Sequence, residues 1–255
     1  MTRRGLFAGG SADEAWGFKS RKSPEADLDI EPANPIVQTR SFGSDPELVG
    51  VAAGTWVRRC QEAGALACIK HFPGHGRTTR DSHDDVPTVD ADLATLEATD
   101  LVPFRAGIAA GVATVMTGHL RVPALDPSGT PATFSAPIRR YLRDTLGFRG
   151  LIVTDALMMG AAVKDAATNP SVRALAAGCD VLCYPADAQA AHEAIADAMK
   201  QGSLSEERVD EAMRRYGEAL LRAQLRLASD SPHPLSPSPA TGEGGRPEGS
   251  GSIAD

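Results

Sequence analysis

The stretch A-L-A-C-I-K-H-F-P-G-H-G, Ala65 to Gly76, is the most informative part of the chain for its fold. Its apolar run, residues 65–69, is short and is closed by Pro73 and Gly74, which is typical of a buried strand that feeds a loop. The segment Lys70 to His83 carries three histidines, an aspartate, two arginines and a lysine. Titratable groups on a loop above a packed sheet are typical of an active site. The stretch therefore predicts a strand with functional groups at its C-terminal end.

Outward from this stretch, apolar runs alternate with segments of helical periodicity, which is typical of βα units around a parallel sheet. We expect strands at residues 28–30, 65–70, 113–118, 151–154 and 180–184, and helices at residues 46–62, 92–110, 136–145, 169–177, 188–200 and 205–227.

Three of the expected strands end in polar residues: Lys70-His71, Thr117-Gly118-His119 and Thr154-Asp155. In a TIM-type (β/α)8 barrel the functional groups lie in the loops after the C-terminal ends of the strands, so these side chains would meet at one mouth. An open doubly wound sheet also binds ligands at strand ends, but no glycine-rich phosphate loop marks the first βα turn. We therefore expect an α/β fold of the TIM-type barrel class.

The number of strands is small for a complete barrel, which takes about 250 residues. We therefore expect an incomplete barrel whose first strands are missing, with weak stability when the chain is alone, because sheet edges and apolar helix faces would be exposed. The expected organisation is an irregular or disordered segment at residues 1–26, the barrel domain at residues 27–228 and a disordered tail rich in Ser, Pro and Gly at residues 229–255.

The composition narrows the class of protein. The chain has 255 residues, 42% hydrophobic and 23% charged, with a net charge of −7. No basic stripe interleaved with aromatic residues is present, which argues against nucleic acid as a partner. Residues 1–20 lack an apolar signal segment and no long apolar run exists, so we expect a cytoplasmic protein that does not bind membranes. We expect its four cysteines to be reduced and the chain to be a monomer.

Two groups suit acid–base or nucleophilic chemistry. Asp155 follows an apolar strand, so it could be a desolvated nucleophile, or equally the cap of a turn or helix. The sequence Asp81-Ser82-His83 could place a carboxylate beside a histidine, which would then exchange protons near neutral pH, but it could also be a polar surface loop. The residues alone leave both alternatives open.

Five motifs taken together resemble one family of enzymes. They are R-S-F-G-S-D-P (40–46), K-H-F-P-G-H-G (70–76), D-S-H (81–83), M-T-G-H (116–119) and L-G-F-R-G-L-I-V-T-D-A-L-M-M-G-A (146–161). In this order and at similar spacing they resemble the β-N-acetylhexosaminidases of glycoside hydrolase family three, over about residues 27–225. The combination is more specific than any single motif.

The resemblance implies a retaining glycoside hydrolase on a TIM-barrel-like domain that releases terminal β-linked N-acetylglucosamine. Asp155 would attack the anomeric carbon and form a glycosyl-enzyme. His83, paired with Asp81, would protonate the departing sugar and then activate water. Known cytoplasmic relatives act on anhydro-muropeptides derived from peptidoglycan during cell-wall recycling, so the resemblance also implies that substrate.

The resemblance further implies a set of substrate-binding residues. Arg40, Lys70 and His71 match positions that bind the N-acetylglucosamine hydroxyls in the minus-one subsite. Fixed donors on sugar oxygens can strengthen as the oxocarbenium-like transition state forms. His75 would shape the loop and His119 would line the pocket, neither with a catalytic role. The resemblance implies no cofactor and no metal.

The chain departs from the family near its beginning. Relatives carry two further strands, the second ending in a D-Q-E-G-G-like segment whose aspartate binds sugar hydroxyls, and residues 1–26 contain nothing similar. An inactive, truncated sugar-binding remnant is therefore one alternative. A phosphorylase is another, because a histidine acid/base tolerates incoming phosphate better than a carboxylate does.

A metal-dependent hydrolase is a further alternative, because four histidines could in principle gather around zinc. The break at Pro73 and Gly74 prevents His71 and His75 from sharing a helical face as the two histidines of H-E-x-x-H do. The sequence therefore favours the glycosidase over a zinc enzyme.

Overall fold

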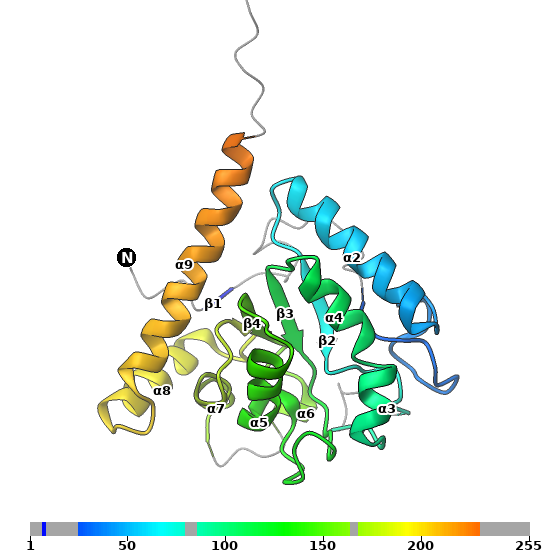
Figure 1. Ribbon diagram of the computed structural model, residues 1–255. Helices are drawn as coiled ribbons and strands as arrows, with labels where there is room; N and C mark the ends of the chain where they lie inside the picture. The colour runs from blue at the N-terminus through cyan, green and yellow to red at the C-terminus, as the bar shows by residue number, and fades with distance from the viewer. Residues whose placement is uncertain (1–6, 9–24, 80–85, 164–167, 230–255) are drawn as a thin grey trace, which may run out of the picture.

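The computed structural model describes residues 7–8, 25–79, 86–163 and 168–229. Short parallel strands lie at the centre and helices surround them (Figure 1). The strands are β1 (Phe7–Ala8), β2 (Cys68–Phe72), β3 (Thr114–Thr117), β4 (Leu151–Thr154) and β5 (Leu182–Cys183). The helices are α2 (Pro46–Glu62), α3 (Leu93–Ala98), α4 (Val102–Ala109), α5 (Ala136–Arg140), α6 (Gly160–Val163), α7 (Pro170–Ala177), α8 (Ala188–Lys200) and α9 (Glu206–Ser229), with short helical turns η2 (Gln38–Arg40), η3 (Ala132–Phe134) and η4 (Tyr141–Thr145).

The strands form one parallel series. β2, β3 and β4 pair in that order, with Thr114 opposite both Cys68 and Leu151. A single bridge from Val153 to Val181 continues the series to β5, which pairs with β1. At the other edge, a bridge joins Glu25 to β2. Parallel pairing places the C-terminal ends of β2, β3 and β4 at the same edge, which is where a site can form.

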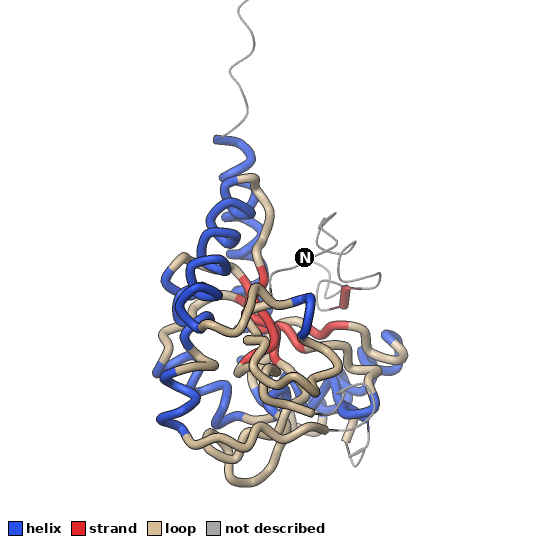
Figure 2. The backbone as a smooth tube through the Cα atoms, turned by 90° about the vertical axis from the view of Figure 1, so that its right-hand side faces the viewer, coloured by secondary structure: helices blue, strands red, loops and turns tan. Residues whose placement is uncertain are grey.

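Each face of this sheet has its own apolar cluster. On one face, Phe72 of β2 meets Phe104 of α4 edge to face, with ring centroids 5.3 Å apart. On the other face, Met116, Val153 and Cys183 pack with Ala219 of α9. Alternate residues of a strand point to opposite faces, so both faces of the sheet are covered by packing. The central position of the strands among the helices is also visible in Figure 2.

The helix boundaries follow ordinary capping chemistry. The Asp45 side chain accepts hydrogen bonds from the N–H groups of Glu47 and Leu48, both at 2.9 Å, and Pro46 occupies the first turn of α2. Asp187 caps α8 in the same way. Helices α2 and α8 have the bounds predicted from the sequence, because capping and hydrophobic periodicity agree there. Strand β4 also has its predicted bounds, which are those of its apolar run.

The predicted strand at residues 28–30 is wrong. The backbone there makes loop contacts instead of a ladder: the N–H of Asp29 donates to the Gly43 carbonyl, and the Ser41 hydroxyl donates to the Asp27 carbonyl. The backbone of Gly76, in the loop after β2, lies against Leu28. A Cβ atom on Gly76 would be 2.1 Å from the Leu28 carbonyl oxygen. A neighbouring strand cannot occupy that side, because the loop after β2 fills it.

The predicted single helix at residues 92–110 is two helices, α3 and α4. Pro103 lies in the first turn of α4 and has no N–H with which to continue the ladder of α3. Asp100, between the helices, is buried and accepts a hydrogen bond from Arg77 at 2.8 Å. This hydrogen bond therefore connects the segment between α3 and α4 to the loop after β2.

Within the described residues, no helix combines the length and the apolar character needed to cross a bilayer.

Candidate active site

The polar residues at the ends of β2 and β4 lie next to each other, and the end of β3 contacts the backbone beside them. His71 lies in β2, and Asp155 directly follows β4. The Nε2 atom of His71 is 3.8 Å from the Oδ2 atom of Asp155. The parallel arrangement predicted from the sequence therefore accounts for this pairing of residues 84 positions apart (155 minus 71).

Asp155 is held at the tip of its strand by the neighbouring backbone. Its N–H donates to the Thr117 carbonyl at 3.1 Å, and its Oδ1 accepts from the N–H of Ala156 at 2.8 Å. Its side chain is 20% exposed, so a substrate can reach a carboxylate that is otherwise enclosed. Burial tends to raise the pKa of Asp155, but His71, His119, the Ala156 N–H and Lys70 together hold that pKa below its ordinary value. The carboxylate is therefore ionised at neutral pH, as a nucleophile requires.

His71 is held by a second carboxylate, Asp27, on its far side. Its Nδ1 lies 2.7 Å from Asp27 Oδ2, and its backbone N–H donates to both carboxylate oxygens of Asp27 at 3.1 Å. Asp27 also accepts from the N–H of His75 at 2.7 Å and is completely buried. Burial tends to raise the pKa of Asp27, but the charge and hydrogen bond of His71, with His75, lower it below its ordinary value. The imidazole thus lies between two ionised carboxylates.

Sequence reasoning missed Asp27. Its contacts with His71 and His75 span 44 and 48 residues, so no local pattern could indicate them. The only local signal is an aspartate in the short apolar stretch Ala26-Asp27-Leu28, which is unusual for a buried position.

Arg40 and Lys70, the other expected sugar-binding residues, lie around a further carboxylate that the sequence did not single out. The Arg40 guanidinium forms an ion pair with Glu25, whose side chain is almost fully buried whereas that of Arg40 is 45% exposed. Burial raises the pKa of Glu25 above its ordinary value, against the opposing effects of His71, Arg40 and Lys70. Lys70 directly precedes His71 in β2, and a backbone bridge joins Glu25 to Lys70. The ion pair with Glu25 therefore places Arg40 close to the same strand.

The remaining described histidines near the strand ends support the walls of the site. His75 is buried, and its Nδ1 is hydrogen-bonded to the Thr78 hydroxyl, consistent with the expected role in shaping the loop. His119 is completely buried, so it lies behind the wall of the site and does not line the pocket as expected. Its Nε2 is 3.0 Å from the Ala156 carbonyl oxygen, and its Nδ1 is 2.9 Å from the Thr133 hydroxyl. His119 therefore fixes the backbone next to Asp155.

The expected acid/base pair, Asp81 and His83, lies outside the described residues. The described residues on either side of that segment belong to the same region as the site. On one side Thr78 bonds to His75, and on the other Thr88 bridges to Arg121, which follows β3.

The described residues contain no group of three or more His, Cys, Asp or Glu side chains arranged to hold a metal ion. Of the four histidines considered as zinc ligands from the sequence, His83 lies outside the part of the chain to which this statement applies.

A cavity of about 250 Å³ lies at the opposite ends of the strands, lined among others by Ala113, Gly150, Arg149 and Arg215. Ala113 and Gly150 directly precede β3 and β4, whereas Asp155 follows β4. The cavity is therefore remote from the carboxylates and histidine described above, and we place the candidate active site at the C-terminal strand ends.

A parallel sheet with an ionised, accessible carboxylate at its C-terminal edge, beside a buried histidine and cationic residues, defines an α/β protein with a site suited to carbohydrate chemistry. Residues 10–218 match the family model described as the Glycosyl hydrolase family 3 N terminal domain. The chain belongs to this family, whose N-terminal domain is of the TIM-barrel type.

Individual relatives agree with this assignment. Beta-hexosaminidase A of Pseudoalteromonas piscicida is 34% identical over 239 residues, which are 84% of this chain and 39% of the relative. The structure of a glycoside hydrolase family 3 beta-N-acetylglucosaminidase from Paenibacillus sp. str. FPU-7 superposes with a TM-score of 0.77 and 38% identity, covering 91% of this chain and 44% of that one. The structure of a protein named Beta-glucoside phosphorylase BglX has a TM-score of 0.76 and 29% identity, covering 80% and 39%. The chain thus spans less than half the length of each of these proteins.

Proposed function

We propose that this chain carries the catalytic site of a β-N-acetylglucosaminidase, which releases terminal β-linked N-acetylglucosamine with retention of configuration. The observation that carries the proposal is the ionised carboxylate of Asp155 at a strand end, 3.8 Å from His71 and accessible from outside. Relatives named beta-hexosaminidase and beta-N-acetylglucosaminidase support the same sugar.

In the proposed first step, Asp155 attacks the anomeric carbon as the bond to the leaving group breaks. His83, oriented by Asp81, gives a proton to the departing oxygen, so that a neutral alcohol leaves and a covalent glycosyl-enzyme remains. In the second step His83 takes a proton from water, which attacks the anomeric carbon and releases Asp155. The two inversions together retain the configuration of the sugar.

The positive groups near Asp155 suit the ground state and the transition state of this reaction. Lys70 would donate to a sugar hydroxyl and His71 would bind another, while both lower the pKa of the nucleophile. Arg40 would bind a hydroxyl with the part of its guanidinium that Glu25 does not engage. We propose a peptidoglycan-derived muropeptide as the physiological glycoside, a cytoplasmic location and a monomeric chain. Sedimentation at a mass of about one chain, 26.7 kDa, would support the last of these.

As a finer proposal on the fold, we infer that the barrel is incomplete. Five strands are described, whereas a complete barrel of this class has eight, and two of the five are only two residues long. Proteolysis under native conditions tests this inference, because an open sheet edge would be cut faster than a closed barrel. Resistance equal to that of a complete family barrel would contradict it.

The test of function is turnover of an aryl N-acetyl-β-glucosaminide by the full chain. Asp155→Ala and His83→Ala should each reduce turnover by roughly 10²-fold or more, because each removes a reacting group. Asp197→Ala is a matched control, since Asp197 lies on the exposed surface of α8 and its loss should leave the rate unchanged.

The products and the variants decide between the alternatives. If Asp155→Ala kept the wild-type rate, the assigned nucleophile would be wrong. Sugar-1-phosphate as the main product in phosphate buffer would indicate phosphorolysis, the activity for which one structurally similar protein is named. Folded chain without turnover in any form would favour a sugar-binding remnant, and activity lost on chelation and restored by metal would favour a metal-dependent hydrolase.

A further inference from the structure

The Asp27 carboxylate accepts hydrogen bonds from two histidines of the candidate site, His71 and His75. It is completely buried, and its two oxygens accept from His71 N–H, His71 Nδ1 and His75 N–H at 2.7 to 3.1 Å. An ionised carboxylate is an acceptor only, so every one of these partners must supply the proton. The Nδ1 atom of His71 therefore carries a proton while Asp27 is ionised.

The other ring nitrogen of His71 is directed at the proposed nucleophile. Since Nδ1 bonds to Asp27, the ring cannot turn over without breaking that bond, and Nε2 stays 3.8 Å from Asp155 Oδ2. The two ring nitrogens of a histidine are chemically distinct, and the partner of one fixes what the other can do. The line Asp27, His71, Asp155 thus runs from the buried interior to the accessible carboxylate.

We propose that Asp27 is a positioning residue that fixes the proton of His71 on Nδ1 and holds Nε2 toward Asp155 and the bound sugar. This inference rests on the proposed function only in its kinetic consequences. Asp27 is completely buried and does not contact Asp155; it acts through His71, and its further bond to the N–H of His75 holds the loop after β2.

The groups around Asp155 and His71 show which properties of the site depend on the position of the imidazole. Asp155 is faced by His71, Lys70 and the Cys68 thiol from β2, by His75 in the loop after β2, by His119 after β3 and by the Cys183 thiol from β5. Of the side chains that lower the pKa of Asp155, His71 and Lys70 come from β2 and His119 follows β3.

His71 is faced by Asp27, Glu25, His75 and Asp155. Of these, Asp27 alone bonds to a ring nitrogen within hydrogen-bond distance among the described contacts. Loss of its carboxylate would therefore release the ring and with it the effect of His71 on the pKa of Asp155.

The direct test is the nitrogen NMR spectrum of substrate-free full chain near neutral pH. The His71 signal is identified as the one absent from a His71→Gln variant. We expect the shift and couplings of Nδ1 to be those of a protonated nitrogen. An unprotonated Nδ1 in wild-type chain would overturn the proposal, whether or not Asp27→Asn folds and whether or not the chain turns over a glycoside.

The kinetic test is Asp27→Asn, with Asp29→Asn as its matched control because Asp29 is exposed two residues away. The amide cannot accept from all of the N–H contacts of Asp27, because one oxygen becomes an NH2 group. A histidine left in the wrong tautomer lowers kcat by up to about 10⁴-fold in a known catalytic triad, so we expect a fall of roughly 10² to 10⁴-fold here. Asp29→Asn should retain the wild-type rate.

A structural role alone would not change the pH profile. In Asp27→Asn the acid limb of kcat/KM should move to higher pH, because the pKa of Asp155 rises when His71, which lowers it, is no longer held beside the carboxylate. An unchanged acid limb in folded Asp27→Asn would contradict the proposal, as would an unchanged kcat. Loss of turnover in Asp155→Ala reports on the proposed function independently, so failure of one claim is distinguishable from failure of the other.

Discussion

At Asp155, burial and positive charge act on one carboxyl group in opposite directions, and charge prevails. The residue was predicted from the sequence because it follows an apolar strand, and its proximity to His71 was predicted because parallel strands end at one edge. Asp27 and Glu25 were not predicted, because their importance comes from contacts with residues more than 14 positions away. The roles of these buried carboxylates follow from long-range contacts, which the folded structure shows and the sequence does not.

His75 gives a prediction on the pH dependence of stability. Burial lowers the pKa of His75 below its ordinary value of 6.5, against the opposing effect of Asp27. The unfolded chain therefore binds a proton in a pH range where folded His75 stays neutral, so stability is full above pH 6.5 and falls as pH decreases below it. In His75→Asn, thermal unfolding should lose less stability between neutral and mildly acidic pH.

The control for this measurement is His192→Asn, because His192 is exposed on α8 and its replacement should keep the wild-type pH dependence. Equal pH dependence of wild type and His75→Asn would show that His75 does not remain neutral in the folded chain.

At the scale of elements, the bounds of α2, α8 and β4 follow from the sequence because local capping and periodicity agree with the tertiary packing. Residues 28–30 do not form the expected strand, because a long-range loop occupies the place of a neighbouring strand. The predicted helix at residues 136–145 becomes α5 followed by a π-helical turn, η4, which directs Arg143 into the interior. Such changes depend on distant partners that a local pattern does not contain.

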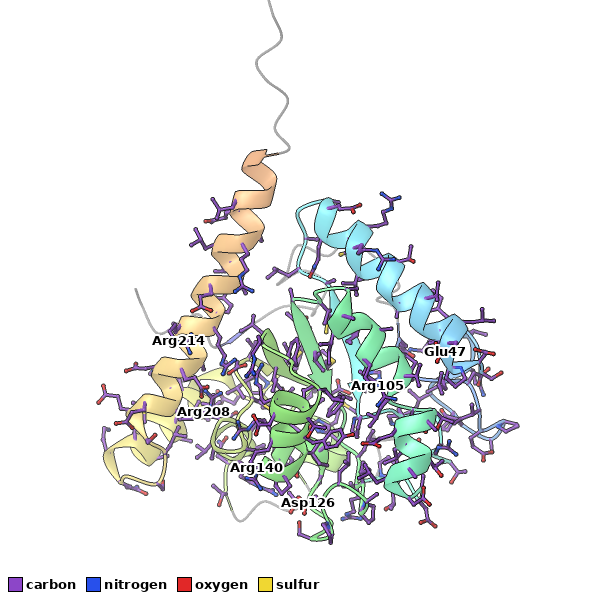
Figure 3. The ribbon with its side chains drawn as sticks, viewed as in Figure 1. Glu47, Arg105, Asp126, Arg140, Arg208 and Arg214 are labelled. Carbon is purple, nitrogen blue, oxygen red and sulfur yellow. The ribbon has the colours of Figure 1, made fainter. Side chains whose placement is uncertain are left out.

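One buried carboxylate, Asp180, connects η4, α9 and β4 through hydrogen bonds. It precedes β5 and accepts hydrogen bonds from Arg143 of η4 at 2.6 Å, from Arg208 of α9 at 2.8 Å and from the N–H of Ile152 in β4 at 2.9 Å. Arg208 lies near the beginning of α9 (Figure 3). The network therefore attaches the first turns of α9 to the sheet.

Asp180→Asn should destabilise the chain by roughly 3–5 kcal/mol, because it leaves buried guanidinium charges without their anion. Urea unfolding followed by circular dichroism measures this loss. Asp197→Asn is the matched control: its pair with Lys200 is exposed, and such pairs contribute about 0–1 kcal/mol. A loss for Asp180→Asn no greater than that of the control would refute the role assigned to the network.

At the scale of the whole molecule, the alternation of strands and helices predicted the α/β class, and the five motifs predicted the family that the comparisons confirm. The packing of α9 on one face of the sheet, through Tyr216 and Ala219, was not predicted. An amphipathic pattern identifies which side of a helix is apolar, but it does not specify the surface that this side will cover. The beginning of α9 lies against the body, and its later turns extend beyond it (Figure 1).

The central claim is that Asp155 forms a covalent bond to the sugar. The most direct measurement treats full chain with a 5-fluoro N-acetylglucosaminide that has a good leaving group, which slows release of the intermediate by destabilising the oxocarbenium-like transition state. Peptide mass spectrometry should then find the fluorosugar on Asp155, and none in Asp155→Ala. A sugar bound to another residue, or no adduct on folded wild-type chain that turns over the substrate, would contradict the account.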